Sequence, residues 1–196
     1  MVCGLPKTCT TTFMEVFRIL GIKTHDNCPK CLPEEMNLNN NIVWNCDDNL
    51  DNSNMKFYDG FHDPPYSLNY KSFYEKYPNS KFILSVRNPE KWFQSLKKYS
   101  KAEYYDYVAF PKKLLKYLFG RDEVLEKDKD HFIKKYNEYN NKVIEFFKSK
   151  NKEILVINVA ENNSVKNWEL VLKYLEVDEN LYDKLIKQPF PHKNKQ

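Results

Sequence analysis

The sequence predicts an α/β fold in which a parallel sheet is covered by helices on both faces. Short apolar segments alternate with longer amphipathic segments along the chain, which is typical of parallel strands joined by helical crossovers. Residues 81–86 alternate too little for an exposed strand, which favours a strand buried on both faces. A tight polar turn followed by a helix lies near the start of the chain.

The first elements surround this turn. Residues 1–3 are apolar and are expected to be the strand that leads into it. Residues 10–20 are predicted to be helical because Phe13, Phe17 and Leu20 share one face, with Gly21 suited to ending the helix. Residues 22–25 predict a second short strand.

The remaining elements follow a polar segment. Residues 28–54 are rich in Asn and Asp and predict a long surface loop with a strand candidate at 42–44. Another strand candidate, 55–59, runs into Gly60 and Phe61. Ser164 is expected to cap the last helix. Further predicted helices are 70–77, 90–99, 104–119, 128–148 and 164–175, with strands at 81–86 and 153–159.

Length and composition suggest a single domain over residues 1–196. The net charge of +4 is mild and its lysines are interleaved with acidic residues, so an anionic ligand is expected but no nucleic acid. The sequence has no long apolar run and no signal-peptide pattern, so we expect neither a membrane span nor secretion. An odd number of cysteines, five, then predicts reduced thiols and a cytoplasmic location.

The turn has the character of an oxyanion site. It reads Gly4-Leu5-Pro6-Lys7-Thr8-Cys9-Thr10-Thr11-Thr12. A helix N-terminus presents free backbone N–H groups and partial positive charge, to which a lysine and several hydroxyl groups are added here. The nucleotide triphosphate loop ends in Gly-Lys followed by Ser or Thr, which this chain lacks. The turn is therefore a phosphate-type loop with a different layout.

Three motifs in order resemble the sulfotransferase family. The loop Pro6-Lys7-Thr8-Cys9-Thr10-Thr11 resembles its Pro-Lys-Ser/Thr-Gly-Thr-Thr loop for the 5′-phosphosulfate. Residues 77–95 resemble its strand, Arg-Asp/Asn-Pro turn and helix, with Ser95 eight residues after Arg87. Residues 189–194, Pro-Phe-Pro-His-Lys-Asn, are similar to the tail of a small sulfotransferase-like branch.

This resemblance implies a three-layer fold of the P-loop NTPase-like type, with a central parallel sheet of about four or five strands. It also implies sulfuryl transfer from 3′-phosphoadenosine 5′-phosphosulfate (PAPS) to a small-molecule or glycan acceptor. Arg87 and Ser95 would hold the 3′-phosphate, Lys7 would neutralise charge on the leaving phosphate, and no metal is expected. The loop residues implied to bind the donor are Pro6, Lys7, Thr8, Cys9, Thr10, Thr11 and Thr12.

Two adjacent residues compete for the role of general base. His62 lies upstream of Arg87 in the interval where cytosolic sulfotransferases keep their histidine, and histidine suits proton abstraction near neutral pH. In the small branch the matching segment reads Asp-x-Pro, which is here Asp63-Pro64-Pro65. Because Pro64 favours an extended residue before it, the two side chains are expected to face opposite sides.

Cys9 stands where the family has glycine. Glycine adopts positive φ freely, so a side chain there costs on the order of 1 kcal/mol if the backbone is left-handed. A thiol at a helix N-terminus also tends toward the thiolate, which would repel sulfate. Cys9 therefore favours an alternative in which the chain is a catalytically impaired nucleotide- or protein-binding relic.

Other readings remain open. A small nucleotide-dependent phosphotransferase is the second alternative, disfavoured because neither Gly-Lys nor an acidic strand end is present to hold magnesium. His25, Cys28, Cys31 and Cys46 are a weak set of zinc ligands, since only one CxxC is present. The aromatic segment 99–119 is a candidate wall or lid of the acceptor site. The sequence identifies neither the acceptor nor the oligomeric state.

Overall fold

The structure is a computed structural model that describes residues 1–25, 58–64, 66–100 and 110–192. Its assigned strands form two parallel pairs. β1 (Thr24–His25) pairs with β2 (Gly60–Phe61), and β3 (Ile83–Ser85) pairs with β4 (Leu155–Ile157). The parallel pairing predicted from the alternation of elements is therefore confirmed.

The first residues of the chain link the two strand pairs. The backbone N–H of Val2 donates to the Phe61 carbonyl oxygen at 2.9 Å, and that of Cys3 donates to the Ile83 carbonyl oxygen at 2.7 Å. Residues 1–3 therefore lie between β2 and β3, in the strand-like role expected of them. A continuous sheet of four or five strands goes beyond these assigned pairs and stays a prediction.

The helices agree with the predicted segments to within about two residues at their described ends, and a short helix after residue 178 was not predicted. The predicted start at 104 lies outside the described residues, as do the loop at 28–54 and its strand candidate at 42–44. The helices are α1 (Thr10–Ile19), α3 (Tyr70–Lys76), α4 (Pro89–Ser100), α5 (Phe110–Phe119), α6 (Lys129–Ser149), α7 (Ser164–Leu175) and α8 (Glu179–Leu185), with 3-10 turns η3 (Tyr66–Asn69) and η5 (Glu126–Asp128).

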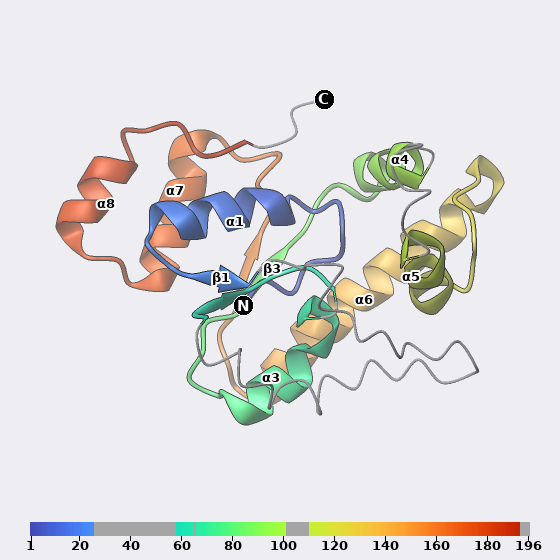
Figure 1. The fold of residues 1–196 in the computed structure, drawn as a ribbon, viewed down its shortest axis with the longest axis horizontal. Helices are drawn as coiled ribbons and strands as arrows, with labels where there is room; N and C mark the ends of the chain where they lie inside the picture. Colours follow the sequence, from blue (N-terminus) through green and yellow to red (C-terminus); the bar gives the residue numbers. More distant parts are fainter. Residues whose placement is uncertain (26–57, 65, 101–109, 193–196) are drawn as a thin grey trace.

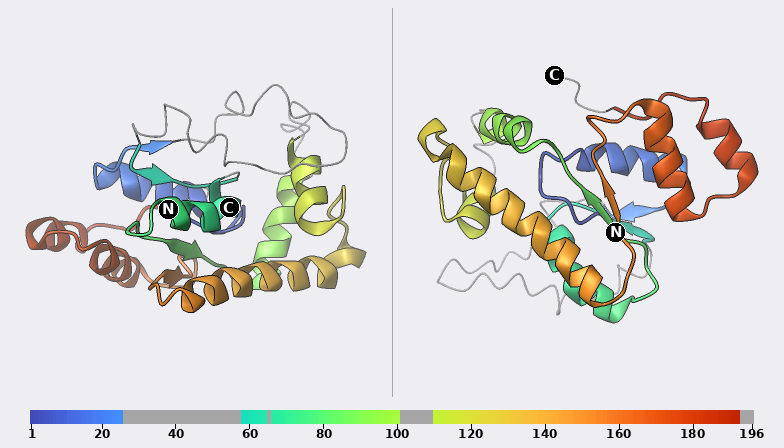
Figure 2. Two further views of the ribbon diagram at one scale, coloured as in Figure 1. Left: turned by 90° about the horizontal axis from the view of Figure 1, so that it is seen from below. Right: turned by 180° about the vertical axis from the view of Figure 1, so that it is seen from behind.

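Helices cover both faces of the strands. Val2, Ile83 and Ile157 pack with apolar residues of α1 and α7. The alternate positions Cys3 and Leu84 pack instead with residues of α3 and α6. Figure 1 and the right view of Figure 2 show α1, α7 and α8 on one side of the strands and α3 and α6 on the other. Because successive side chains of a strand point to opposite faces of the sheet, the strands contribute to two separate hydrophobic cores.

Two predicted details are wrong. Residues 58 and 59 are not strand, and the pairing strand β2 starts at Gly60. A Cβ on Gly60 would lie 3.0 Å from Thr24 Cγ2, so glycine allows this close strand approach. The cap of α7 is Asn163, whose side chain accepts from the Lys166 N–H at 2.8 Å.

Ser164, which the sequence predicts to cap α7, forms hydrogen bonds with the C-terminal tail instead. Ser164 Oγ accepts a hydrogen bond from the Phe190 N–H and lies 3.3 Å from the Gln188 carbonyl oxygen. The Phe190 ring packs edge-on against Trp168, with centroids 4.8 Å apart. The described part of the Pro-Phe-Pro tail, residues 189–192, is therefore held against α7.

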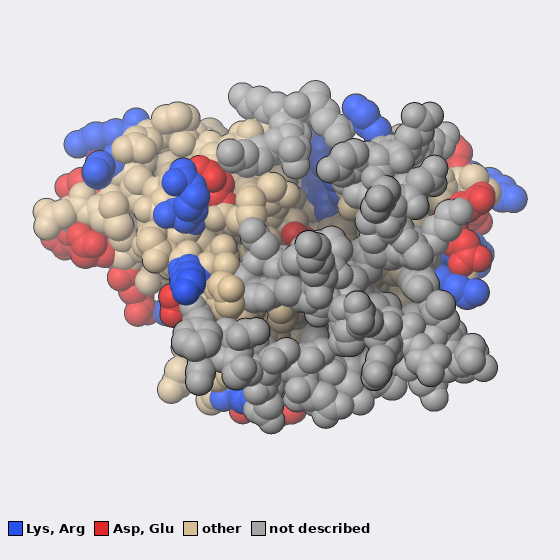
Figure 3. Space-filling view, in the orientation of Figure 1, with Lys and Arg blue, Asp and Glu red and all other residues tan. Residues whose placement is uncertain are grey.

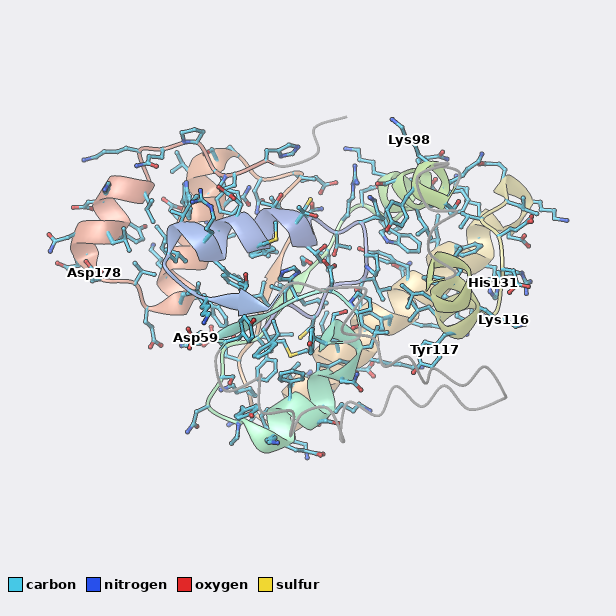
Figure 4. All side chains as sticks on the ribbon, in the orientation of Figure 1. Asp59, Lys98, Lys116, Tyr117, His131 and Asp178 are labelled. Carbon is cyan, nitrogen blue, oxygen red and sulfur yellow. The ribbon has the colours of Figure 1, made fainter. Side chains whose placement is uncertain are left out.

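Charged side chains are spread over the described surface. Figure 3 shows Lys and Arg interspersed with Asp and Glu over the visible described part of one face. Lys98, Lys116 and Asp178 point outward from α4, α5 and the start of α8 (Figure 4). Among the described helices, none combines the length and the apolar character needed to cross a membrane.

Candidate functional site

The loop between residues 3 and 10 brings backbone donors to the start of α1. Lys7 and Cys9 both have left-handed backbone conformations, with φ of 73° and 70°, and Cys9 is the N-cap. The N–H groups of Thr12 and Phe13 both donate to the Cys9 carbonyl oxygen. This leaves the N–H groups of Thr10 and Thr11 directed out of the helix N-terminus, where an anion can accept from them.

The loop is pressed against the carboxyl end of β3. A Cβ on Gly4 would lie 2.0 Å from Ser85 Oγ and 2.6 Å from the Ser85 carbonyl oxygen, so only glycine fits. The buried Thr8 hydroxyl donates to the Leu5 carbonyl oxygen at 2.6 Å and accepts from Ser85 Oγ at 2.8 Å. The Thr8 hydroxyl therefore stabilises the loop, while Thr10 and Thr11 are the first two residues of α1.

Helix α4 fixes the other side of the loop. Trp92 is buried, and its Nε1 donates to the Pro6 carbonyl oxygen at 3.0 Å. Ser95 lies on the same buried face of α4. Asn88 caps this helix through its side-chain oxygen, which accepts from the Glu90 and Lys91 N–H groups at 3.1 and 3.2 Å. The turn that carries Arg87 is thereby joined to the helix that holds the loop.

Two cationic side chains lie near the loop. Lys7 Nζ lies 4.2 Å from the centroid of the Tyr99 ring. Burial lowers the pKa of Lys7, and the nearby charge of Arg87 lowers it further. Arg87 Nε is buried without a hydrogen-bond acceptor, and Arg87 has no ion pair within the described residues. The arrangement leaves positive charge that an anionic ligand can neutralise.

The backbone of Arg87 is held in place by hydrogen bonds to a tyrosine of α6. The Tyr136 hydroxyl accepts from the Arg87 N–H at 2.8 Å and donates to the Arg87 carbonyl oxygen at 3.1 Å. The Tyr139 hydroxyl, one turn along, lies 2.8 Å from the Cys3 carbonyl oxygen and 2.9 Å from the Ser67 carbonyl oxygen, which share its single proton. Buried hydroxyl groups of one helix therefore hold the chain at three points around the site.

His62 and Asp63 form a pair, which corrects the expectation that they face opposite sides. His62 Nδ1 lies 3.1 Å from Asp63 Oδ2, and the histidine is only 3% exposed. Asp63 has a left-handed backbone with φ of 60°, despite the proline that follows it. The alternation rule for extended segments therefore does not apply. The charge of Asp63 also acts on Lys7, which places the pair near the loop.

The Cys9 thiol differs from its predicted behaviour. Burial raises the pKa of Cys9 above its ordinary value of 9.0, although Arg87 and Lys7 act in the opposite direction. Burial therefore favours the neutral thiol, contrary to the predicted tendency toward the thiolate. Its left-handed backbone, in contrast, is the costly conformation foreseen for a residue with a side chain.

An apolar pocket opens beside the loop, between α4 and α5. Its walls include Trp92, Leu96 and Tyr99 of α4, Leu115 and Phe119 of α5, and Pro6 of the loop. Tyr99 also contacts Lys7, so the pocket and the cationic loop share a wall. The predicted acceptor region at 99–119 contributes to this pocket through its described residues.

Sequence reasoning missed three residues that shape the site: Ser85, Trp92 and Tyr136. Ser85 and Trp92 lie in the predicted strand 81–86 and the predicted helix 90–99, and neither was given a role in the site. The one sequence signal for Tyr136 is its place on the buried face of α6, next to Phe132. That signal predicts burial but not the partner of the hydroxyl.

The zinc set is not assembled within the described residues. His25 lies in β1, whereas Cys28, Cys31 and Cys46 lie outside the described residues. In the described part of the chain, no three His, Cys, Asp or Glu side chains are grouped as metal ligands.

Comparison with protein-family models indicates the family of this chain. A family model described as a sulfotransferase domain matches residues 1–196. No match was found among curated proteins. The family match agrees with the resemblance carried by the loop, the Arg87 segment and the tail.

Proposed function

The chain belongs to the sulfotransferase domain family, and we propose that it transfers a sulfuryl group from PAPS to a hydroxyl or amine acceptor. The main support for this proposal is the position of two cationic side chains, Lys7 and Arg87, near a helix N-terminus that presents backbone N–H groups to an anion. Arg87 Nε is buried without an acceptor, and Lys7 is part of the loop that precedes α1. PAPS carries two anionic groups, a 5′-phosphosulfate and a 3′-phosphate, which match two separate cationic positions.

The two positions take different roles in the proposal. The N–H groups at the start of α1, the hydroxyl groups of Thr10 and Thr11, and Lys7 bind the phosphosulfate. The planar guanidinium of Arg87 binds the 3′-phosphate, with Ser95 of α4 as a further donor. PAPS supplies an activated sulfuryl group, and the protein contributes position and charge stabilisation.

His62 is the proposed general base, oriented by Asp63. A carboxylate that accepts from Nδ1–H fixes the tautomer in which Nε2 carries the lone pair. Nε2 then takes the proton from the acceptor as the acceptor's oxygen or nitrogen attacks sulfur. The bond between sulfur and the 5′-phosphate oxygen breaks in the same step, and adenosine 3′,5′-bisphosphate leaves with the bonding electron pair. Because the two residues are in contact, the proposal gives each of them a role: His62 removes the proton and Asp63 orients His62.

The apolar pocket is proposed to form part of the acceptor site. Its cavity volume is about 30 Å³, which suits an apolar substituent rather than a whole acceptor molecule. It shares Tyr99 with the Lys7 contact, so a group seated between α4 and α5 lies beside the loop. Its walls of Trp92, Leu96 and Phe119 favour an apolar group over a sugar, because sugars need polar partners.

Calorimetry with adenosine 3′,5′-bisphosphate tests the donor assignment. The parent should bind this ligand without magnesium, and Arg87→Ala should weaken binding by about 2 kcal/mol or more. Adenosine 5′-phosphate, which lacks the 3′-phosphate, should be affected much less. Arg121→Ala is the matched control, because Arg121 is an exposed arginine that pairs with Asp128.

Other results would overturn the proposal in distinct ways. Equal loss of both ligands in Arg87→Ala would remove Arg87 from the 3′-phosphate site. Magnesium-dependent binding of ATP in place of the bisphosphate would support the phosphotransferase. Binding of neither nucleotide would support the relic that Cys9 suggests.

A further inference from the structure

Tyr136 makes the same pair of hydrogen bonds that two backbone groups of a strand would make. Its hydroxyl binds both the N–H and the carbonyl oxygen of Arg87, at 2.8 and 3.1 Å. Tyr136 is 1% exposed, whereas Arg87 is half-buried, so the ring that carries these two bonds is fixed within the core. Because the backbone of Arg87 is fixed on both sides, the direction in which its side chain leaves the chain is also fixed.

The same tyrosine is connected to the donor loop. Its ring stacks on Trp92, with centroids 4.3 Å apart and an interplanar angle of 22°. Trp92 Nε1 donates to the Pro6 carbonyl oxygen at 3.0 Å. Pro6, Trp92, Tyr136 and Arg87 thus form one chain of contacts, buried at Trp92 and Tyr136, between two segments about 80 residues apart in sequence.

We propose that Tyr136 is a positioning residue that sets the place of Arg87 relative to the loop, and thereby the preference for a nucleotide with a 3′-phosphate. This inference rests on the proposed function. A ligand with two anionic groups at a fixed separation binds best when both sites are held at that separation before binding. Tyr136 does not touch the ligand in this proposal and acts through Arg87.

Tyr174 of α7 offers a matched control. Its hydroxyl accepts from the Phe82 N–H at 3.0 Å and donates to the Phe82 carbonyl oxygen at 2.9 Å. Phe82 precedes β3, whereas Arg87 follows it, so two tyrosines hold the two ends of the same strand. The Glu153 carbonyl oxygen lies 3.2 Å from the same hydroxyl and shares its single proton with the Phe82 carbonyl oxygen.

The test compares Tyr136→Phe with Tyr174→Phe. Both variants keep the ring and lose a buried hydroxyl that binds backbone, so both should lower the midpoint of thermal unfolding. The measured quantity is the ratio of affinities for adenosine 3′,5′-bisphosphate and adenosine 5′-phosphate. Tyr136→Phe should lower this ratio by about tenfold, and Tyr174→Phe should leave it at the parent value.

Each other outcome overturns the inference. An unchanged ratio in Tyr136→Phe, with a parent that discriminates, would mean that the hydroxyl only stabilises the fold. Equal loss of discrimination in both variants would point to general loosening around β3. A parent that does not discriminate between the two nucleotides would overturn the proposed function and this inference with it.

Discussion

At the scale of single residues, Cys9 carries a measurable conformational cost. Its φ of 70° and ψ of 28° lie in the left-handed region, and the side chain packs partly against the core beside α1. Glycine adopts this conformation without a steric penalty, but it lacks the Cβ and sulfur that make the packing contact. Comparing glycine with alanine separates the two effects, since both lack sulfur and only alanine keeps the Cβ.

We expect Cys9→Gly to be more stable than Cys9→Ala by about 1 kcal/mol in urea unfolding. We also expect Cys9→Gly to bind adenosine 3′,5′-bisphosphate at least as tightly as the parent. If the alanine variant is equally stable, the left-handed backbone is not a cost. If the glycine variant binds more weakly, the thiol itself contributes to the site.

The His62–Asp63 pair leads to a second prediction at this scale. His62→Ala should lower the release of adenosine 3′,5′-bisphosphate from PAPS by roughly 100-fold or more, with nucleotide binding intact. Asp63→Asn should lower it less, because the base remains and only its orientation is lost. If His62→Ala keeps near-normal turnover while Asp63→Asn abolishes it, Asp63 is the base and the roles are reversed.

At the scale of elements, the contact between the loop and β3 depends on Gly4. A Cβ at this position would overlap both the side chain and the backbone of Ser85. Gly4→Ala therefore has to move the loop away from the strand, at a cost of about 1–3 kcal/mol. The same displacement should weaken binding of adenosine 3′,5′-bisphosphate, which calorimetry can measure.

Gly120→Ala provides the control for this prediction. Gly120 has φ of 65° and nothing within 4 Å of an added Cβ, so alanine there costs conformational energy without a clash. It should lower the free energy of unfolding by about 1 kcal/mol and leave nucleotide binding unchanged. Normal binding by Gly4→Ala would show that the loop does not need its contact with Ser85.

At the scale of the whole molecule, buried acids should make the fold sensitive to alkali. Burial raises the pKa of Cys3 from 9.0 to about 12 and that of Tyr70 from 10.0 to about 12. At a pH between the unfolded and the folded pKa values, these groups remain protonated in the folded state but are ionised in the unfolded state. Their contribution to stability is complete below about pH 9 and decreases as the pH rises toward 12.

Urea unfolding between pH 7 and 11 in the presence of a reductant tests this expectation. The free energy of unfolding of the parent should fall above pH 9, and Cys3→Ala should fall less steeply because one of the ionising groups is gone. A parent whose stability is constant up to pH 11 would contradict it, since the unfolded chain would then gain nothing from ionisation.

The sequence by itself determined what depends on neighbours within a few residues. Apolar periodicity located α1, α4, α6 and α7, and the turn before Thr10 indicated an anion site because caps and free N–H groups are local features. The order of the three motifs indicated the family, which the family match over residues 1–196 confirms.

Only the tertiary structure decided which residues meet across the chain. Thr8 contacts Ser85 from 77 positions away, and Tyr136 holds Arg87 from 49 positions away. The His62–Asp63 contact depends on a positive φ that the following proline argued against. The sequence pattern determines which face of a helix or strand is buried. The residue that each buried side chain contacts depends on how the strands and helices pack against one another, and the whole core determines that packing.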